Sequence, residues 1–292
     1  MPPEPVELAR RRAVADLIAD QWRVEPNVGA VLCSGSTGRG QADRWSDLEM
    51  MVVWSVPPAT TARQRVGMAL GGEDPRLFSY DADGRSWFDE WWWCGPPGRG
   101  LLVETTHVTE ASARLLLDQL LEVPNPQPML LTFASALAYG VPLVGSADAL
   151  TERVRNYPRA VAVEVVQRLG QIDHFWRWQM YLERGNPHGL RRHFAAVVDA
   201  IVHIVHALNG RWWAGSKWPV PGDLRIAPPS LAARLAAADR QPPDLAAGTL
   251  AELVGECYDL VAAHLREVDV RRLRAIFGFA REPWPNDNGD DR

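Results

Sequence analysis

The sequence predicts an α/β (α+β) protein in which a small mixed-sheet domain is followed by a C-terminal bundle of helices. Three short apolar runs with strand character occur early in the chain, at residues 28–33, 47–54 and 100–108. After a proline-rich break at 124–128, apolar residues recur almost throughout at helical spacing. With 292 residues, of which 47% are hydrophobic, the chain is long enough to form two domains.

We expect the first domain to span 1–123 and to contain helices between and around its strands. Apolar residues at helical spacing predict a helix over 6–24, ahead of the first strand. Helical patterns also cover 59–69, between the second and third strands, and 110–122, after the third.

The second domain is expected to span 129–281 and to be almost wholly helical. Its predicted helices are 129–139, 147–155, 158–184, 188–209, 229–238 and 247–277. The last residues, 282–292, are acidic and polar, and we expect them to form a disordered tail.

The first predicted strand runs directly into a turn rich in glycine and serine. Gly35 lets the backbone come close to a ligand, and the N–H groups of the turn can cradle a phosphate together with the Ser36 hydroxyl. Arg39 can add a forked donor to the same anion. A Walker loop is excluded because no lysine follows Gly40, and the glycines lack the dinucleotide-binding spacing.

Two carboxylates follow the turn after ten intervening residues. Asp47 and Glu49 open the second predicted strand, where side chains alternate between the two faces of the sheet. Both carboxylates are therefore predicted to lie on one face, where they can hold Mg²⁺. Acidic residues at the start of a strand are more commonly solvated, so the ordered set of turn and carboxylates carries the prediction.

This set resembles the signature of the polymerase-β-like nucleotidyltransferase superfamily. The segment Ser46-Asp-Leu-Glu-Met-Met51 looks most like the kanamycin (aminoglycoside) nucleotidyltransferases. The resemblance is strong over residues 28–54 and extends to about residue 110. It implies a nucleotidyltransferase domain, ATP or another NTP as co-substrate, Mg²⁺ (or Mn²⁺) as metal, a third carboxylate from a later strand, and a homodimer whose subunits build the site together.

Glu104 is the candidate for that third carboxylate. It lies in the middle of the apolar strand 100–108, and a charged residue there is costly to bury unless it is paired or binds a metal. His107 is expected to face the opposite side of the sheet and to be structural.

The tryptophan-rich segment 84–98 has two interpretations. Aromatic runs most often belong to a core. The alternative is a wall for the acceptor substrate, in which indole rings and the nearby acids receive a cationic or ring-bearing molecule. The acids in question are Asp89, Glu90, Asp74, Asp81 and Asp83.

A polar stripe on the predicted helix 188–209 offers candidates for a general base. Asp199, His203 and His206 fall at i, i+4 and i+7, so they share a face, and a nearby carboxylate can raise the pKa of a histidine. The kanamycin enzymes, which the chain resembles, have a carboxylate base on the corresponding helix, whereas here the matching position falls near Ala207 or His206. A metal half-site and isolated surface histidines are the other interpretations.

Two cations beyond this helix are candidates for binding the triphosphate or the departing pyrophosphate. They are Arg211 and Lys217, and Lys217 is the only lysine of the chain. A helix C-terminal cation is the structural alternative.

Composition excludes several classes of protein. The formal charge is -5 and no dense basic run appears, so we expect no nucleic-acid partner; Arg10 to Arg12 are expected to form a solvated helix face. The three cysteines are too few and too scattered for a disulfide framework or a zinc site. With neither a leader pattern nor a membrane-spanning apolar run, the expected location is cytoplasmic, with no membrane partner.

The sequence therefore predicts a metal-dependent nucleotidyltransferase that moves a nucleoside monophosphate from an NTP to a hydroxyl of a small molecule. The expected acceptor is an aminoglycoside or a related amino-sugar, which implies a role in antibiotic resistance. Two alternatives stay open, namely an antitoxin-type protein adenylyltransferase and a non-catalytic nucleotide-binding module.

Overall fold

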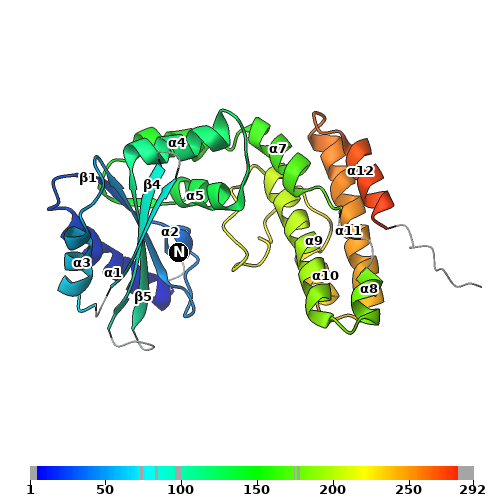
Figure 1. The fold of residues 1–292 in the computed structure, drawn as a ribbon, viewed down its shortest axis with the longest axis horizontal. Coiled ribbons are helices and arrows are strands. Elements are labelled where there is room, and N and C mark those ends of the chain that lie inside the picture. Colours follow the sequence, from blue (N-terminus) through cyan, green and yellow to red (C-terminus); the bar gives the residue numbers. More distant parts are fainter. Residues whose placement is uncertain are drawn as a thin grey trace, which may run out of the picture. The chain divides into compact units, whose positions relative to one another are not determined.

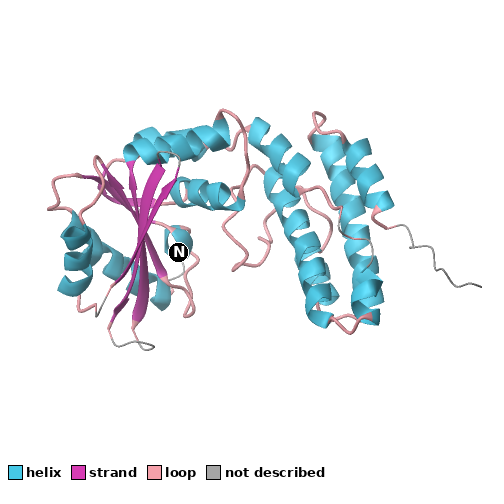
Figure 2. Ribbon diagram, in the orientation of Figure 1, coloured by secondary structure: helices cyan, strands magenta, loops and turns pink. Residues whose placement is uncertain are grey.

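The predicted fold class is confirmed by a computed structural model, which describes residues 5–72, 75–82, 85–95, 100–173, 175 and 178–281. The described chain combines a six-stranded mixed sheet with many helices (Figure 2). It divides into two compact units. The sheet unit comprises Met1–Val123 and Gln127–Asn156, and the helical unit comprises Pro124–Pro126 and Tyr157–Arg292.

The sheet has the strand order β3-β4-β5-β2-β1-β6. Its strands are β1 (Val28–Cys33), β2 (Leu48–Trp54), β3 (Arg76–Ala82), β4 (Arg85–Cys94), β5 (Leu101–Thr109) and β6 (Val141–Gly145). The central pair, β2 and β5, is parallel, and all other neighbouring strands are antiparallel.

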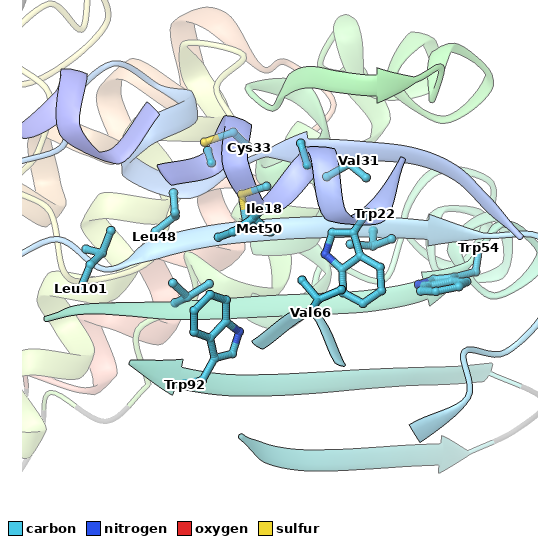
Figure 3. Close-up of a cluster of buried hydrophobic side chains, with 14 residues drawn as sticks. Ile18, Trp22, Val31, Cys33, Leu48, Met50, Trp54, Val66, Trp92 and Leu101 are labelled. Carbon is cyan, nitrogen blue, oxygen red and sulfur yellow. The ribbon is translucent and has the colours of Figure 1, made fainter. Parts of the chain in front are cut away.

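The helices of the sheet unit lie on both faces of the sheet (Figure 1). They are α1 (Val6–Trp22), α2 (Gly35–Gly38), α3 (Thr60–Ala69), α4 (Glu110–Leu121), α5 (Pro128–Ala138) and α6 (Asp148–Arg155). Helices α1 and α3 pack on one face, which we call the core face. There Ile18 and Trp22 of α1 contact the inward side chains of β1 and β2, such as Val31 and Met50 (Figure 3).

Strand register decides which side chains lie on the other face, which we call the site face. Glu49 is paired with Glu104, and Glu104 is also paired with Trp91 of β4. Paired residues share a face, and neighbours along a strand alternate. Leu48 and Val103 belong to the core face, so Glu49, Glu104 and Trp91 all lie on the site face.

The helical unit is built around α9 (Pro187–Leu208), which packs against α7 (Arg159–Leu169) and α11 (Pro243–His264). Its other helices are α8 (Trp178–Glu183), α10 (Leu231–Ala238) and α12 (Val270–Phe279). The predicted apolar ladder of α9 is buried at Leu190, Val197, Ile201 and Ile204. Helix α11 is tied to the end of α7 because the Tyr258 hydroxyl donates to the Gly170 carbonyl at 2.9 Å.

The division of the chain differs from the expected one. Residues 129–156, expected in the helical domain, belong in the structure to the sheet unit. The reason is β6, a strand at 141–145 that the helical pattern did not predict, which pairs with β1 and brings α5 and α6 with it.

Two predicted helices are each interrupted in the structure. The pattern over 158–184 corresponds to α7 and α8, because α7 ends at Leu169 and Gly170 caps it. The pattern over 247–277 corresponds to α11 and α12, since the Asp269 side chain accepts from the Arg272 N–H and caps a new helix. The expected acidic tail, 282–292, lies outside the described residues. Among the helices that are described, none combines the length and the hydropathy needed to span a membrane.

Candidate active site

The Gly-Ser turn connects β1 to the rest of the site face and is tied to β2. The backbone N–H of Ser34 donates to the Glu49 carbonyl at 2.9 Å, and the Ser34 hydroxyl donates to the same oxygen at 3.2 Å. The turn then closes on itself, because the N–H of Gly38 donates to the Ser34 carbonyl at 2.8 Å. These bonds hold the turn beside the first residues of β2.

Gly35 lets the turn approach the Glu49 carboxylate more closely than any other residue would. Its φ is +57°, a conformation that side chains rarely adopt. A Cβ built on Gly35 would lie 1.2 Å from Glu49 Oε2, which is impossible without displacing the carboxylate. The sequence predicted a glycine for close backbone approach, and the structure identifies Glu49 as the group approached.

Two hydroxyls of the turn have hydrogen-bonding capacity to spare. Ser36 and Thr37 are 4% and 1% exposed, and within the described chain their Oγ atoms have no hydrogen-bond partner. Buried polar atoms are usually satisfied, so each orphaned hydroxyl calls for a water or a ligand as its partner. Each hydroxyl can donate one hydrogen bond, so a phosphate oxygen is a chemically suitable partner for either.

The structure brings the three predicted carboxylates together. One oxygen from each of Asp47, Glu49 and Glu104 lies within 4.8 Å of the others, and all three residues are partly buried. Among the described residues this is the one cluster of at least three His, Cys, Asp or Glu side chains that could hold a metal ion.

Electrostatics at the triad favour a bound cation. The pKa of Glu104 is raised by burial and then by repulsion from Glu49, Asp47 and Asp89, while a hydrogen bond from the Trp91 indole opposes the rise. Like-charged carboxylates held this closely are destabilising unless a proton or a cation neutralises them. Mg²⁺ and Mn²⁺ prefer oxygen ligands of this kind, so the residues present fit the expected metal.

Arg39 is the remaining predicted phosphate donor of the turn. It is half-buried and caps α2, where its N–H donates to the Gly35 carbonyl at 3.1 Å. Burial lowers the pKa of the guanidinium, whereas the neighbouring Glu49 and Tyr139 act in the opposite direction. Arg39 therefore belongs to the same cluster as the turn and the triad.

Arg11 is a residue of this region that the sequence analysis missed. The expected solvated face over Arg10 to Arg12 is wrong for Arg11, which is 3% exposed. Its guanidinium donates to the Ser46 carbonyl through Nε at 2.9 Å and through Nη2 at 2.5 Å, and Nη1 is paired with Glu7. Arg11 thus anchors the backbone directly before Asp47. The i,i+4 spacing of Glu7 and Arg11 is the sequence signal that could have indicated it.

His107 faces the opposite side of the sheet from Glu104, as predicted. It is fully buried on the core face, where Trp54 Nε1 donates to His107 Nδ1 at 3.1 Å. Glu90 is buried beside it, with Glu90 Oε2 lying 3.3 Å from His107 Nε2. Glu90 therefore cannot belong to a substrate wall on the site face.

The tryptophan-rich segment belongs only in part to the core. It forms β4, in which Trp92 is buried in the core and Trp91, on the opposite face, is 40% exposed. Of the acids named with it, Asp89 lies on the site face. Asp74 and Asp83 lie outside the described residues, as does the side chain of Asp81.

The three base candidates all lie on α9 in the helical unit, but they differ in exposure. Asp199 is exposed, whereas His203 and His206 are 6% and 8% exposed. The expectation that Asp199 raises a histidine pKa is wrong. Burial lowers the pKa of His203 to about 4, with a smaller effect from His206, and burial also lowers the pKa of His206. Burial raises the pKa of Asp199.

The two candidate cations follow α9 in the same unit. The Arg211 guanidinium forms a two-pronged ion pair with Asp223, with N–O distances of 2.8 and 2.6 Å. Lys217 is exposed in the loop that follows.

Comparisons with known proteins give limited similarity. Residues 140–219 match a family described as a domain of unknown function, DUF4037. A solved nucleotidyltransferase-like protein from Exiguobacterium sibiricum is 14% identical, with 93% of this chain and 89% of that chain covered and a TM-score of 0.38. No curated protein matches the chain.

Solved RNA-modifying enzymes are also similar. Cid1 poly(U) polymerase bound to MgGTP is 14% identical, with 58% of this chain and 45% of that chain covered and a TM-score of 0.29. A cytoplasmic RNA terminal U-transferase is 15% identical, with 58% and 43% covered and a TM-score of 0.27. The chain thus spans less than half the length of these two enzymes, and TM-scores this low do not establish a shared function.

Proposed function

We propose that this protein is an enzyme, a metal-dependent nucleotidyltransferase that transfers a nucleoside monophosphate from an NTP, most simply ATP, to a hydroxyl group. One observation carries the proposal: a turn with two orphaned hydroxyls, Ser36 and Thr37, lies directly against a carboxylate of a three-carboxylate cluster. A triphosphate needs donors for its oxygens and a cation for its charge, and this arrangement offers a place for both.

The reaction forms one bond and breaks another. An acceptor hydroxyl oxygen attacks the α-phosphorus, the bond from that phosphorus to the bridging oxygen of the β-phosphate breaks, and pyrophosphate leaves with the bonding electrons. Ser36, Thr37 and Arg39 bind the phosphate oxygens, and Asp47, Glu49 and Glu104 hold the cation. When bound, Mg²⁺ neutralises phosphate charge and lowers the pKa of an oxygen that it contacts.

The hydroxyl proton passes to a general base, for which the candidates are Asp199, His203 and His206. Asp199 has the best properties among them, because its side chain is accessible and because partial desolvation of the carboxylate raises its pKa. Arg211 and Lys217 remain the candidate cations for the departing pyrophosphate.

The proposed acceptor is a small cationic molecule, such as an aminoglycoside or another amino-sugar. Support comes from the formal charge of -5, which opposes tight binding of a nucleic-acid backbone, and from the kanamycin-like segment around Asp47. Modification of such a molecule would confer antibiotic resistance.

Transfer of label from α-³²P-labelled nucleotides tests the proposal. The protein is incubated with each of the four labelled NTPs, Mg²⁺ and one acceptor at a time: an aminoglycoside pool, a single-stranded RNA oligonucleotide, or an untreated lysate. We expect label on a small molecule from the first mixture and none with Asp47→Asn. Label on RNA or on a protein would mean that the acceptor is that macromolecule and not a small molecule. Absence of label from every mixture would contradict the enzyme proposal.

A further inference from the structure

The groups of the site face follow one another across the sheet in a fixed order. The Gly-Ser turn lies at the end of β1, Glu49 lies on β2, Glu104 lies on β5 and Trp91 lies on β4. Register pairs Glu49 with Glu104 and Glu104 with Trp91, so the carboxylates separate the turn from Trp91.

Trp91 belongs to an aromatic pair beside the carboxylates. Its ring centroid is 5.0 Å from that of Phe78 on β3, and the two rings are inclined by 55°. Strand β4 is an inner strand of the sheet, yet Trp91 is 40% exposed, so part of the site face is left open at this point. An exposed indole on an inner strand offers a flat apolar surface next to the triad.

Asp89 lies two residues before Trp91 and therefore on the same face. It is paired with Phe78 in the register of β3 and β4, and its Oδ1 accepts from the Thr106 hydroxyl at 2.9 Å. Burial raises the pKa of Asp89, which means that its charged form gains from a nearby cation. We call Phe78, Asp89 and Trp91 the acceptor platform.

We propose that the acceptor platform binds the acceptor substrate of the reaction, and that this substrate carries a protonated amine beside a ring that stacks on Trp91. The inference rests on the proposed function, because it places the acceptor relative to the phosphates. In a phosphoryl transfer the attacking and leaving oxygens lie roughly in line on opposite sides of the phosphorus. With the phosphates in the turn at β1, the attacking hydroxyl comes from the β4 side.

Charge defines the class of molecule that the platform accepts. Four carboxylates share this face, from Asp89 and the triad, and a bound Mg²⁺ neutralises only part of their charge. Register places Arg76 of β3 opposite Trp91 on the same face, while Arg39 acts on Glu49 and Arg63 acts on Asp89. An amine is attracted both to this acidic surface and to the indole ring by cation–π interaction, whereas a phosphate backbone is repelled.

Calorimetric binding measurements test the platform directly. Kanamycin A, spermidine, the neutral sugar maltotriose and a single-stranded uridine oligonucleotide serve as probes, each titrated into the full chain with Mg²⁺ and a non-hydrolysable ATP analogue. The variants are Trp91→Ala, Trp91→Phe and Asp89→Asn. The controls are Leu17→Ala and Asp20→Asn, two exposed positions of α1, the helix that packs on the core face.

We expect kanamycin A to bind the wild type and the neutral sugar to bind far more weakly. Trp91→Ala and Asp89→Asn should each weaken the binding of kanamycin A by roughly tenfold, the order of a cation–π contact or a partly buried ion pair. Trp91→Phe, which keeps a ring but loses the N–H donor, should lie within a few-fold of the wild type. Unchanged binding of kanamycin A in both Trp91→Ala and Asp89→Asn overturns the proposal. A wild type that binds neither kanamycin A nor spermidine also overturns it, as does binding of the uridine oligonucleotide that these two substitutions weaken.

Binding of the ATP analogue in the same titrations separates this proposal from the proposed function. If the analogue and Mg²⁺ bind every variant equally, the loss of kanamycin binding is local to the platform. If the wild type binds neither the analogue nor Mg²⁺, the nucleotidyltransferase proposal fails, whatever the platform binds.

Discussion

Gly35 is the residue on which the close approach of turn and carboxylate depends. We predict that Gly35→Ala lowers the affinity for Mn²⁺ and the transfer rate, because the new Cβ would overlap Glu49 Oε2. Gly40→Ala is the matched control, since Gly40 also has a positive φ, +71°, but a Cβ there meets no atom within 4 Å. Alanine at a positive φ costs about 1–2 kcal/mol of backbone strain in both variants, so only the steric clash with Glu49 distinguishes them. Equal Mn²⁺ affinities, measured by electron paramagnetic resonance, would contradict the account.

Arg11 is predicted to be a positioning residue for the metal ligands. Arg11→Met removes two donors from the Ser46 carbonyl and should weaken Mn²⁺ binding by several-fold to tenfold. Arg11→Lys keeps one charged donor and should recover part of this loss. Arg10→Met, at an exposed position of the same helix, is the control. If Arg11→Met changes thermal stability but not Mn²⁺ affinity, then Arg11 is merely structural.

These residues show how far a sequence can predict a site. The proximity of Gly35, Asp47, Glu49 and Glu104 could be predicted because their types and spacing are tied to strand geometry, which the apolar pattern reveals. Arg11 could not be found in this way. An arginine triplet on a helix gives no sign of which member is buried, since burial depends on packing against a distant loop.

Helix α9 is the element that carries the base candidates. We predict that Asp199→Asn lowers kcat by roughly a hundredfold or more with little change in the KM for ATP, as expected for a group that acts only in proton transfer. His203→Gln and His206→Gln should have smaller effects on kcat, because both histidines are buried and burial lowers their pKa values, which makes them weaker proton acceptors. Steady-state kinetics of the three variants would contradict this if all retain kcat within a few-fold, and the base would then lie elsewhere.

His203 instead makes stability depend on pH. Its pKa is lowered from 6.5 to about 4 in the folded chain, so the unfolded state binds more protons between these two values. The neutral imidazole therefore makes its full contribution to the free energy of unfolding above pH 6.5. This contribution is lost as the pH falls toward 4, and the loss is at most about 3 kcal/mol. His203→Gln removes the effect. In urea denaturation, the free energy of unfolding of the wild type minus that of the variant should fall from pH 7 to pH 4.5. An equal difference at the two pH values would contradict this role of His203.

Among the elements, those with a strong apolar period could be predicted and those defined by pairing could not. The strands β1 and β2 and the helices α1 and α9 match their predicted ranges closely. Strand β6 was missed because its five residues carry a weak pattern and become a strand only by pairing with β1. Strand β4 was noticed for its tryptophans, but its division between core face and site face requires the register with β5.

At the scale of the whole molecule, the turn, the triad and the acceptor platform belong to the sheet unit, and the base candidates belong to the helical unit. Composition indicated two domains but not their division. The proline-rich stretch at 124–128 is a break in the pattern, yet the chain returns to the sheet after it, which local composition cannot reveal.

The central claim is that the carboxylates beside the Gly-Ser turn hold a divalent cation for nucleotidyl transfer. The most direct test measures transfer of α-³²P label from ATP by wild type, Asp47→Asn and Glu49→Gln at saturating Mg²⁺, with circular dichroism to verify folding. We predict that each variant is folded and that its transfer rate is lower by at least about a hundredfold, since several kcal/mol of metal-dependent stabilisation are lost. Turnover like that of the wild type in either variant would contradict the claim.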